Sequence, residues 1–363
     1  MPIINISNIS FSFAKYSYTI DEIVDDILRE KLDPDVREFC KEKLGINRIY
    51  KSYDLSNVEF NDSKYLAPDI KLNDLYAECA KKVLKSRQPD DIGLLTVIND
   101  NQQYLDPSPT VELGIRLGLK KDIRAQNFQG MACSSFSEAL LNSAGHFSLG
   151  LEGNALVLIG TYYTNWFLDR IKQIDHISMA NRDDFNNFIY FLIFSDVAAA
   201  ALLSQADNQA MAQIDTKHIC SRKDTTPDGF RKATVKLVQD KKFRMIFDMS
   251  VNSKILRECS AELSLENVLY LKEKFPSDYE KVKFWGLHSA GKIFVDYIRE
   301  RCSIDPLKSK LTYDVMSETG NTGAASSLQM ILESANRKIL GQEDLGGIID
   351  YGWEGANAFI YNL

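Results

Sequence analysis

The feature that most constrains the fold is a set of short apolar runs separated by segments with helical periodicity. Residues 92–98 (IGLLTVI) and 155–160 (ALVLIG) contain no charged side chain, and a third run, at 194–203, is apolar apart from Ser195 and Asp196. Such runs are typical of strands covered on both faces, because a strand with one exposed face alternates polar and apolar residues. The chain is therefore expected to form sheets enclosed by helices.

Segments with helical and strand periodicity alternate along the rest of the chain. Residues 165–187 are polar and irregular, which predicts a loop or a cap over an opening. The interleaving of helices and strands indicates the α/β class. Helices are predicted over residues 21–31, 35–44, 69–87, 110–117, 250–263, 291–301 and 324–339, and strands over residues 3–19, 234–238, 282–287 and 356–362.

One segment is suited to an exposed connection between two halves of the chain. Residues 216–228 are rich in Lys, Asp, Thr and Pro, which favours a solvated linker. The expected halves are residues 1–215 and residues 229–363.

Composition excludes several classes of protein. The chain has 363 residues, 45% hydrophobic and 26% charged, with a formal net charge of −7, which argues against a protein that coats duplex nucleic acid or a polybasic membrane-binding protein. Its six cysteines are scattered, without a CxxC pair or a histidine cluster, so neither a metal site nor a disulfide framework is predicted. No stretch approaches about 18 apolar residues, so no membrane span is expected and the location is predicted to be cytoplasmic.

Cys133 lies at a junction suited to a nucleophile. A strand-like run ends at Gly130, and apolar residues recur at helical spacing from Phe136 to Phe147, so the thiol is expected at the start of a buried helix. The positive end of a helix favours a thiolate, the reactive form of cysteine. The alternative from this stretch alone is a packed apolar cysteine.

Two later junctions carry polar residues of the right kind. His288 stands between a predicted buried strand and a predicted helix, where the imidazole tends to stay neutral and to offer one N–H. Asn321 lies between Gly320 and Gly323 in another turn. Alone, His288 could be a satisfied core histidine and Asn321 a turn residue or helix cap. Together with Cys133 they occupy three strand or turn junctions that lead into apolar-faced helices, which is where sites form.

These three segments resemble the active-site segments of thiolase-superfamily condensing enzymes, in particular ketoacyl-ACP synthase III and type III polyketide synthases of the chalcone synthase kind. The similarity is closest at 320–326 (GNTGAAS). Residues 43–48 (KLGINR), 117–119 (LGL) and 194–199 (FSDVAA) are similar to further motifs of the family, and 351–355 (YGWEG) to its C-terminal glycine loop. Ser195 and Val197 replace the usual glycines, and the loop with Glu354 differs from the family pattern.

The resemblance implies a five-layered αβαβα fold of two similar halves, with the nucleophile at their interface, and a homodimer. It implies that Cys133 accepts an acyl group from CoA or an acyl carrier protein, and that His288 and Asn321 stabilise the enolate of a malonyl or ketoacyl thioester, without a metal or redox cofactor. Substrate-binding positions are implied at Phe194, Phe243 and Gly352, although ordinary core packing is an equal alternative for the two phenylalanines. Carboxylates near Glu112 assist as bases in some relatives, and no such role is assigned here.

Three alternatives remain open at the level of sequence. Cysteine, histidine and asparagine occur in the same order in papain-like proteases, but residues 130–134 lack that family's cysteine motif. An acyltransferase could move the acyl group from Cys133 to an amine or a hydroxyl, although Asn321 would then have no enolate to bind. A non-catalytic partner subunit would not need all three residues.

Overall fold

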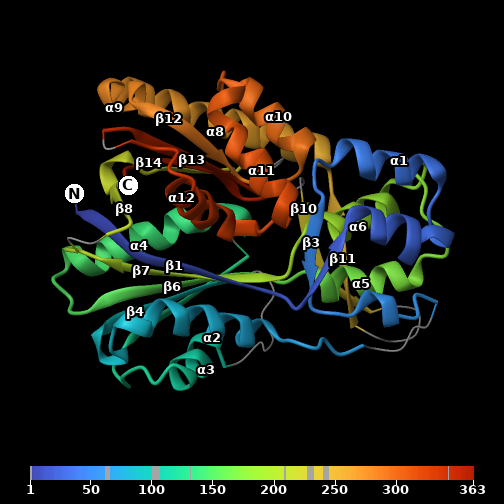
Figure 1. Cartoon of the computed structure of the whole chain (residues 1–363), viewed down its shortest axis with the longest axis horizontal. Helices are drawn as coiled ribbons and strands as arrows, with labels where there is room; N and C mark the ends of the chain where they lie inside the picture. Colours follow the sequence, from blue (N-terminus) through green and yellow to red (C-terminus); the bar gives the residue numbers. More distant parts are fainter. Residues whose placement is uncertain are drawn as a thin grey trace.

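The architecture consists of two sheets and three layers of helices (Figure 1). The structure is a computed structural model that describes residues 2–61, 66–99, 107–130, 132–207, 210–226, 233–239, 245–341 and 343–363. No helix in these ranges is long and apolar enough to cross a membrane.

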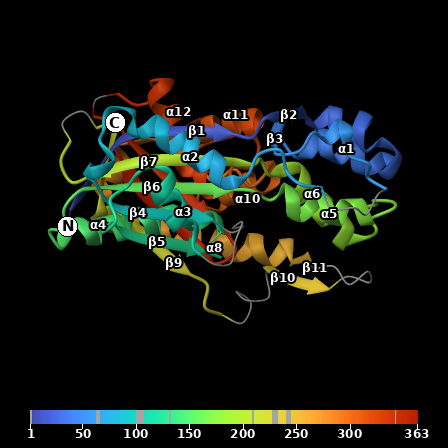
Figure 2. The same cartoon turned by 90° about the horizontal axis from the view of Figure 1, so that it is seen from below.

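The first sheet has six strands in the order β5-β4-β6-β7-β1-β8 (Figure 2). β4 is parallel to β5 and β6, and the remaining pairs are antiparallel. Every residue of β4 and β7 is buried, which confirms the sequence interpretation of the uninterrupted apolar runs. The strands are β1 (Ile3–Phe13), β4 (Ile92–Asn99), β5 (Arg124–Gln129), β6 (Asn154–Thr161), β7 (Val197–Ser204) and β8 (Ala212–Asp215).

The second sheet has the order β12-β13-β14-β9, and β12 and β13 are parallel. Two further pairs, β2 with β3 and β10 with β11, are antiparallel. The strands are β9 (Cys220–Lys223), β12 (Val282–Leu287), β13 (Leu345–Tyr351), β14 (Gly355–Tyr361), β2 (Tyr16–Thr19), β3 (Arg48–Lys51), β10 (Ala233–Gln239) and β11 (Met245–Val251).

Helices fill the space between the sheets and cover their outer faces (Figure 1). α4 (Phe136–Ser148) and α12 (Ser326–Asn336) lie in the middle, where their apolar side chains pack with both sheets in one core. α2 (Leu72–Val83) and α3 (Pro109–Arg116) cover the outer face of the first sheet. α8 (Ser253–Lys274) and α10 (Lys292–Arg301) cover the second, which completes the predicted αβαβα layers.

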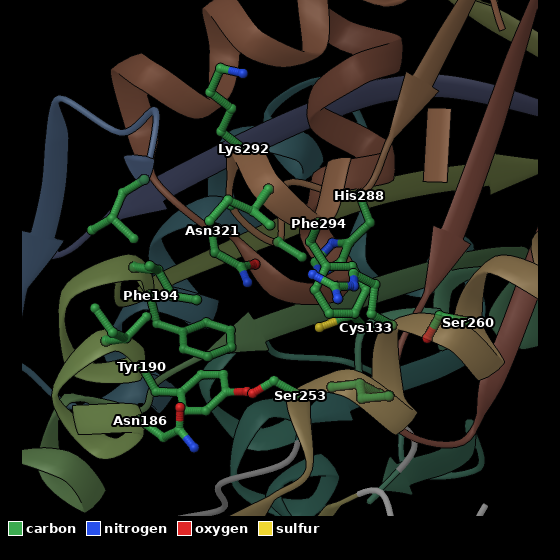
Figure 3. A pocket seen from close by; sticks show the side chains of 18 of the residues that line it. Cys133, Asn186, Tyr190, Phe194, Ser253, Ser260, His288, Lys292, Phe294 and Asn321 are labelled. Carbon is green, nitrogen blue, oxygen red and sulfur yellow. The ribbon is translucent and has the colours of Figure 1, made fainter. Parts of the chain in front are cut away.

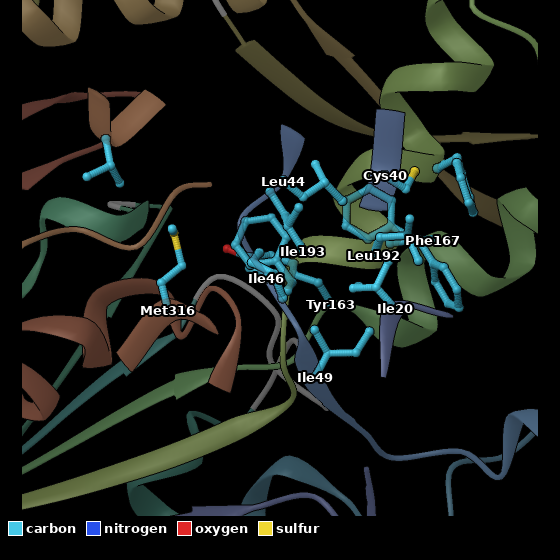
Figure 4. Close-up of a cluster of buried hydrophobic side chains, with 14 of the residues drawn as sticks. Ile20, Cys40, Leu44, Ile46, Ile49, Tyr163, Phe167, Leu192, Ile193 and Met316 are labelled. Carbon is cyan, nitrogen blue, oxygen red and sulfur yellow. The ribbon is translucent and has the colours of Figure 1, made fainter. Parts of the chain in front are cut away.

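A helical lobe at one end of the layers corrects the prediction for residues 165–187. Instead of an irregular loop, this part of the chain forms α5 (Thr164–Gln173) and α6 (Arg182–Ile193). Arg182 and Asp183 face solvent, whereas Lys172 and Asn187 are buried. Phe167 and Leu192 are buried in one hydrophobic cluster with residues of α1 (Pro34–Lys43) and β3 (Figure 4), and Phe188 belongs to the same cluster. The polar residues scattered over 165–187 hide the apolar side of each helix in the sequence.

The segment 216–228 also differs from the prediction of an exposed linker. The chain leaves the first sheet at β8 and joins the second at β9, so the crossing is a single turn, Thr216–His218. Cys220 is buried, and residues 220–223 pair with β14 as an edge strand. Backbone pairing outweighs the polar composition here, because an edge strand needs only one covered face.

Other elements complete the chain. The predicted helix at 21–31 is a wide turn, Glu22–Ile27, followed by a tight one, Arg29–Lys31. α9 (Pro276–Glu280) precedes β12, and α11 (Lys310–Thr319), which no sequence pattern indicated, leads to Asn321.

Candidate active site

Cys133 lies in a single helical turn, Ala132–Ser134, directly before α4. Gly130 ends β5 with a φ of +74°, a conformation that glycine adopts without strain and that turns the chain toward α4. Cys133 is only 8% exposed, and the first turn of α4 offers its thiol the positive end of the helix dipole. The junction therefore has the form that the sequence predicts.

His288 follows the last residue of β12. Its N–H donates to Ile349 at 3.0 Å, and its carbonyl accepts the Tyr351 hydroxyl at 2.7 Å, so strand β13 fixes its backbone. The ring stands edge-on to Tyr351, with centroids 5.3 Å apart, and Nδ1 is 2.9 Å from the Ser326 hydroxyl. The imidazole is therefore held in one orientation, and its tautomer decides which ring nitrogen carries the proton.

Burial controls the charge of this histidine. His288 is 2% exposed, and desolvation lowers its pKa to about 3, although a hydrogen bond with the Gly323 backbone acts in the opposite direction. The ring is therefore neutral at physiological pH, in agreement with the sequence argument for a neutral donor.

Asn321 lies between α11 and the turn Gly323–Ala325. Its backbone is bound on both sides by the end of α6, because its N–H donates to Ile193 at 2.7 Å and its carbonyl accepts from Ser195 at 3.0 Å. Its side-chain oxygen accepts the N–H of Gly323 at 2.8 Å. The carboxamide therefore presents its N–H₂ group as a donor.

A buried cation holds the segment to which Asn321 is bound. Lys51 is fully buried, and its ammonium donates to the carbonyls of Phe191 at 2.5 Å and Phe194 at 2.8 Å, at the end of α6. Burial lowers the pKa of Lys51 to about 8, against the opposing effect of Asp196. Lys51 thus links β3 to the segment that binds the backbone of Asn321.

Cys133, His288 and Asn321 line one cavity of about 290 Å³ (Figure 3). Phe194 and Gly352 line the same cavity, so the structure brings together five of the six residues singled out from the sequence. Phe243 lies outside the described residues. The cavity also receives side chains from α1, α6, α8 and α10, so both halves of the chain and the lobe contribute to it.

The loop that carries Gly352 packs directly on the nucleophile. A Cβ added at Gly352 would lie 3.2 Å from the Cys133 nitrogen and 3.5 Å from its Cβ. The N–H of Gly352 donates to the Gly355 carbonyl at 2.9 Å, which occupies it as a donor. Donors for a substrate oxygen are therefore offered by the side chains of His288 and Asn321.

An aromatic wall borders the cavity on the side of α6. The rings of Phe194 and Tyr190 lie 6.2 Å apart and nearly parallel, and Phe194 also contacts Tyr163 at 4.6 Å. Tyr190 hydrogen-bonds Ser253, and burial raises its pKa to about 12, so its hydroxyl stays neutral. Sequence analysis did not identify Tyr190, which lies just after the segment predicted to be irregular (165–187) and in no motif.

Other lining residues carried no sequence signal. Arg257 and Ser260 project from α8 into the cavity, and Lys43 and Lys292 line it from α1 and α10. Helix periodicity alone does not show which face of a buried helix borders a cavity.

Glu112 is not among the residues that line the cavity. Its carboxylate accepts from Asn73 at 2.7 Å and pairs with Arg116 on α3 at 3.1 Å. Across the described ranges, no group of three or more His, Cys, Asp or Glu side chains is arranged to hold a metal ion.

Comparison with known proteins places the fold. No protein-family model matches the chain, and no curated protein matches its sequence. Among solved structures, 3-oxoacyl-(acyl carrier protein) synthase III (FabH) from Xanthomonas oryzae pv. oryzae is similar with a TM-score of 0.77 and 17% identity, over 99% of this chain and 98% of that chain. OleA from Xanthomonas campestris, solved with lauric acid and lauroyl-CoA, is similar with a TM-score of 0.76 and 18% identity, over 99% of both chains.

At this level of identity the likeness concerns the fold. It extends over nearly the full length of each chain and therefore includes both sheets and the helices between them. The chain therefore has the thiolase-like fold of the condensing enzymes FabH and OleA.

Proposed function

We propose that this protein is a condensing enzyme of the ketoacyl synthase type, an acyltransferase that forms carbon–carbon bonds for fatty-acid or polyketide-like products. The observation that carries the proposal is the convergence of a thiol, a neutral imidazole and a carboxamide on one cavity in a thiolase-like fold. The half formed by residues 1–215 would supply Cys133, and the half formed by 229–363 would supply His288 and Asn321.

The first step is acyl transfer to Cys133. The thiolate attacks the carbonyl carbon of an acyl thioester, the C–S bond to the carrier breaks, and the carrier thiolate leaves and takes up a proton. The aromatic wall at Tyr190 and Phe194 then packs against the acyl chain, because both side chains offer apolar surface beside the nucleophile.

The second step forms the new bond. The carbonyl oxygen of a malonyl or ketoacyl thioester accepts hydrogen bonds from the Asn321 carboxamide and from His288 Nε2, in the tautomer in which Nδ1 accepts from the Ser326 hydroxyl. Loss of CO₂ from a malonyl group, or of a proton from a ketoacyl group, leaves an enolate that these donors stabilise. Each such donor contributes on the order of 3 kcal/mol in comparable sites. The enolate carbon attacks the acyl carbonyl, and the Cys133 thiolate leaves.

Positive charge beside the cavity supports a phosphate-bearing carrier, CoA or an acyl carrier protein. Lys43 and Lys292 line the cavity with side chains 58% and 48% exposed, and each forms a surface ion pair, with Glu42 at 3.5 Å and Asp296 at 2.5 Å, that a phosphate would replace. Exposed ammonium groups of this kind bind phosphate without being buried. In this proposal the chemistry needs thioester substrates and no bound cofactor, and it takes place in the cytoplasm, where the free cysteines stay reduced.

We further propose a homodimer built on strand β5. β5 lies at the edge of the first sheet, and next to it α3 exposes Val111 and Ile115, which are 50% and 77% exposed (Figure 2). A strand edge beside apolar side chains is suited to pairing with a second copy. Light scattering should give twice the chain mass, and Ile115→Asp should shift it toward the monomer; a wild-type monomer at micromolar concentration would contradict the dimer.

Mass spectrometry of the protein incubated with acyl-CoA thioesters tests the first step. We expect one acyl adduct on Cys133, since burial raises the pKa of Cys40 and Cys302 to about 12 and leaves these thiols unreactive. The partly exposed Cys259 provides the control, because Cys259→Ser should retain the adduct and Cys133→Ser should lose the thioester. An adduct elsewhere, or none with any acyl donor, would count against the proposal.

Asn321→Ala separates condensation from the alternative of acyl transfer to an amine or a hydroxyl. The variant should still load Cys133 but lose malonyl decarboxylation by about 100-fold, as expected when one oxyanion donor is removed. Full condensation by this variant would refute the role of Asn321. The thiolase-like fold does not favour the papain-like alternative, and peptide hydrolysis that depends on Cys133 would revive it.

A further inference from the structure

We propose that Arg257 and Ser260 form a carboxylate-binding subsite on the α8 side of the cavity, so that one of the thioester substrates carries a carboxylate. This inference rests on the proposed function and deepens it by naming a substrate class. The shared chemistry is a carboxylate beyond the thioester, carried either by the acyl donor or by the extender.

Arg257 is a cation without a carboxylate partner in the described part of the chain. It lines the cavity, its Nε is buried without a hydrogen-bond partner, and its guanidinium stands 4.9 Å from the centre of the Tyr297 ring. Other arginines are paired with carboxylates, for example Arg299 with Glu300 at 3.1 Å and Arg337 with Glu333 at 2.9 Å. In a chain with a net charge of −7, a half-buried guanidinium that lines a cavity and has no carboxylate partner among the described residues is suited to an external anion.

Ser260 supplies the second, independent observation. Its side chain is completely buried, it lines the same cavity, and its hydroxyl has no hydrogen-bond partner in the described ranges (Figure 3). A buried hydroxyl without a partner costs about 1–3 kcal/mol, and a ligand oxygen that accepts its proton would remove this penalty.

The two groups share one face of α8. Residues three positions apart in a helix are neighbours, so Arg257 and Ser260 point to the same side, together with Leu256. Further along the same face of α8, Val268 and Leu271 pack in the core together with residues of the second sheet, which fixes the helix. The subsite is therefore held by a rigid element rather than by a loop.

The surroundings favour a charged ligand group over a neutral one. Apolar side chains such as Ile189 and Phe294 line the same cavity as Arg257, and in such a setting an ion pair is screened less than in water. A planar guanidinium matches the two oxygens of a carboxylate, and the serine hydroxyl adds a third donor. Because Ser260 is fully buried whereas Lys43 and Lys292 are about half exposed, the subsite lies deeper than the cations suited to a carrier phosphate.

The test compares matched substrates with and without the carboxylate. For the acyl donor, the rate of Cys133 loading is measured with glutaryl-CoA and pentanoyl-CoA. For the extender, binding to the double variant Cys133→Ala/Asn321→Ala, in which decarboxylation is slowed, is measured by calorimetry with malonyl-CoA and propionyl-CoA. We expect at least a tenfold preference for the carboxylate in one arm, and that arm identifies its source.

Variants then assign the preference to the subsite. Arg257→Gln should reduce the preference for the carboxylate at least tenfold, while the rate or affinity for the uncharged analogue changes less than twofold. Arg257→Lys should retain part of the preference, and Ser260→Ala should weaken it about threefold. The matched control is Lys254→Gln, which removes one positive charge from the same helix at a side chain 76% exposed, and should change neither substrate.

The outcomes distinguish failure of the carboxylate subsite from failure of the proposed function. An equal loss with all CoA thioesters would overturn the subsite and indicate a carrier phosphate contact, and so would an absence of any preference in wild type. Absence of every acyl adduct on Cys133 would instead refute the proposed function, whereas the calorimetric preference would still report the subsite.

Discussion

The low pKa of His288 gives a quantitative prediction for the pH dependence of decarboxylation. Burial sets this pKa at about 3, whereas an ordinary histidine has about 6.5. At pH 5.5 an ordinary imidazole would be about 90% protonated and His288 about 0.3%. Lowering the pH from 7.5 to 5.5 would therefore reduce the neutral fraction of an ordinary histidine about tenfold and that of His288 almost not at all. We therefore expect malonyl decarboxylation to change less than twofold over this range.

The assay needs a background in which nearby groups do not titrate. Release of CO₂ from malonyl-CoA is measured in Cys133→Ala, with and without Asp350→Asn, because Asp350 has a pKa raised to about 7 and precedes the tyrosine that binds the His288 carbonyl. Imidazole NMR reports the titration directly, and the His288 signal among four histidines is the one lost in His288→Gln. A midpoint near 6.5, or a tenfold fall in rate at pH 5.5, would refute the assignment of His288 as a permanently neutral donor.

Further predictions concern stability and the neighbourhood of the nucleophile. The folded Asp350 carboxyl keeps its proton up to about pH 7, whereas the unfolded one loses it near pH 4, so the free energy of unfolding falls between these pH values by on the order of 4 kcal/mol. Asp350→Asn should abolish this contribution to the difference in stability between pH 5 and pH 8, measured by urea unfolding. An unchanged difference would contradict the prediction. Lys51→Met should reduce the rate of decarboxylation at least fivefold more than the rate of Cys133 loading. The control is Lys31→Met, which removes a similar buried ammonium from the end of α5 and should not alter the ratio of the two rates. If Lys51→Met reduced both rates equally, Lys51 would have a purely structural role. Gly352→Ala should slow acyl loading of Cys133 about tenfold, because the new Cβ would lie 3.2 Å from the Cys133 nitrogen. A normal loading rate, measured by mass spectrometry of samples quenched over time, would exclude this contact.

Much of the layered fold could be predicted because its signals are local. Strand β12 ends at Leu287 as predicted, and the runs that became β4 and β6 are apolar on both faces. The three site junctions were also visible in sequence, since glycine at a positive φ, as at Gly130 and Gly320, marks a turn that few other residues adopt without strain.

The parts that were not predicted depend on long-range packing. α6 looks irregular in sequence, and its burial follows from contact with α1 and β3, which lie more than a hundred residues earlier in the chain. Likewise, Arg257 and Ser260 belong to a helix with an ordinary polar composition, and only the position of the cavity shows which of its polar groups lack partners.

The backbone around Asn321 couples the shape of the acyl-chain site to the position of the enolate-binding carboxamide, two properties that sequence analysis treats as separate. Phe194 belongs to the wall proposed to contact the acyl chain, and Asn321 is proposed to stabilise the enolate, yet the two residues form a parallel bridge closed by the bonds to Ile193 and Ser195. A substitution that shifts this backbone to make more space beside Phe194 must also shift the Asn321 carboxamide. Changes of acyl-chain preference made at the end of α6 should therefore reduce decarboxylation, whereas a change at the apolar Leu256 of α8, which shares no such bridge with Asn321, should alter preference without that loss.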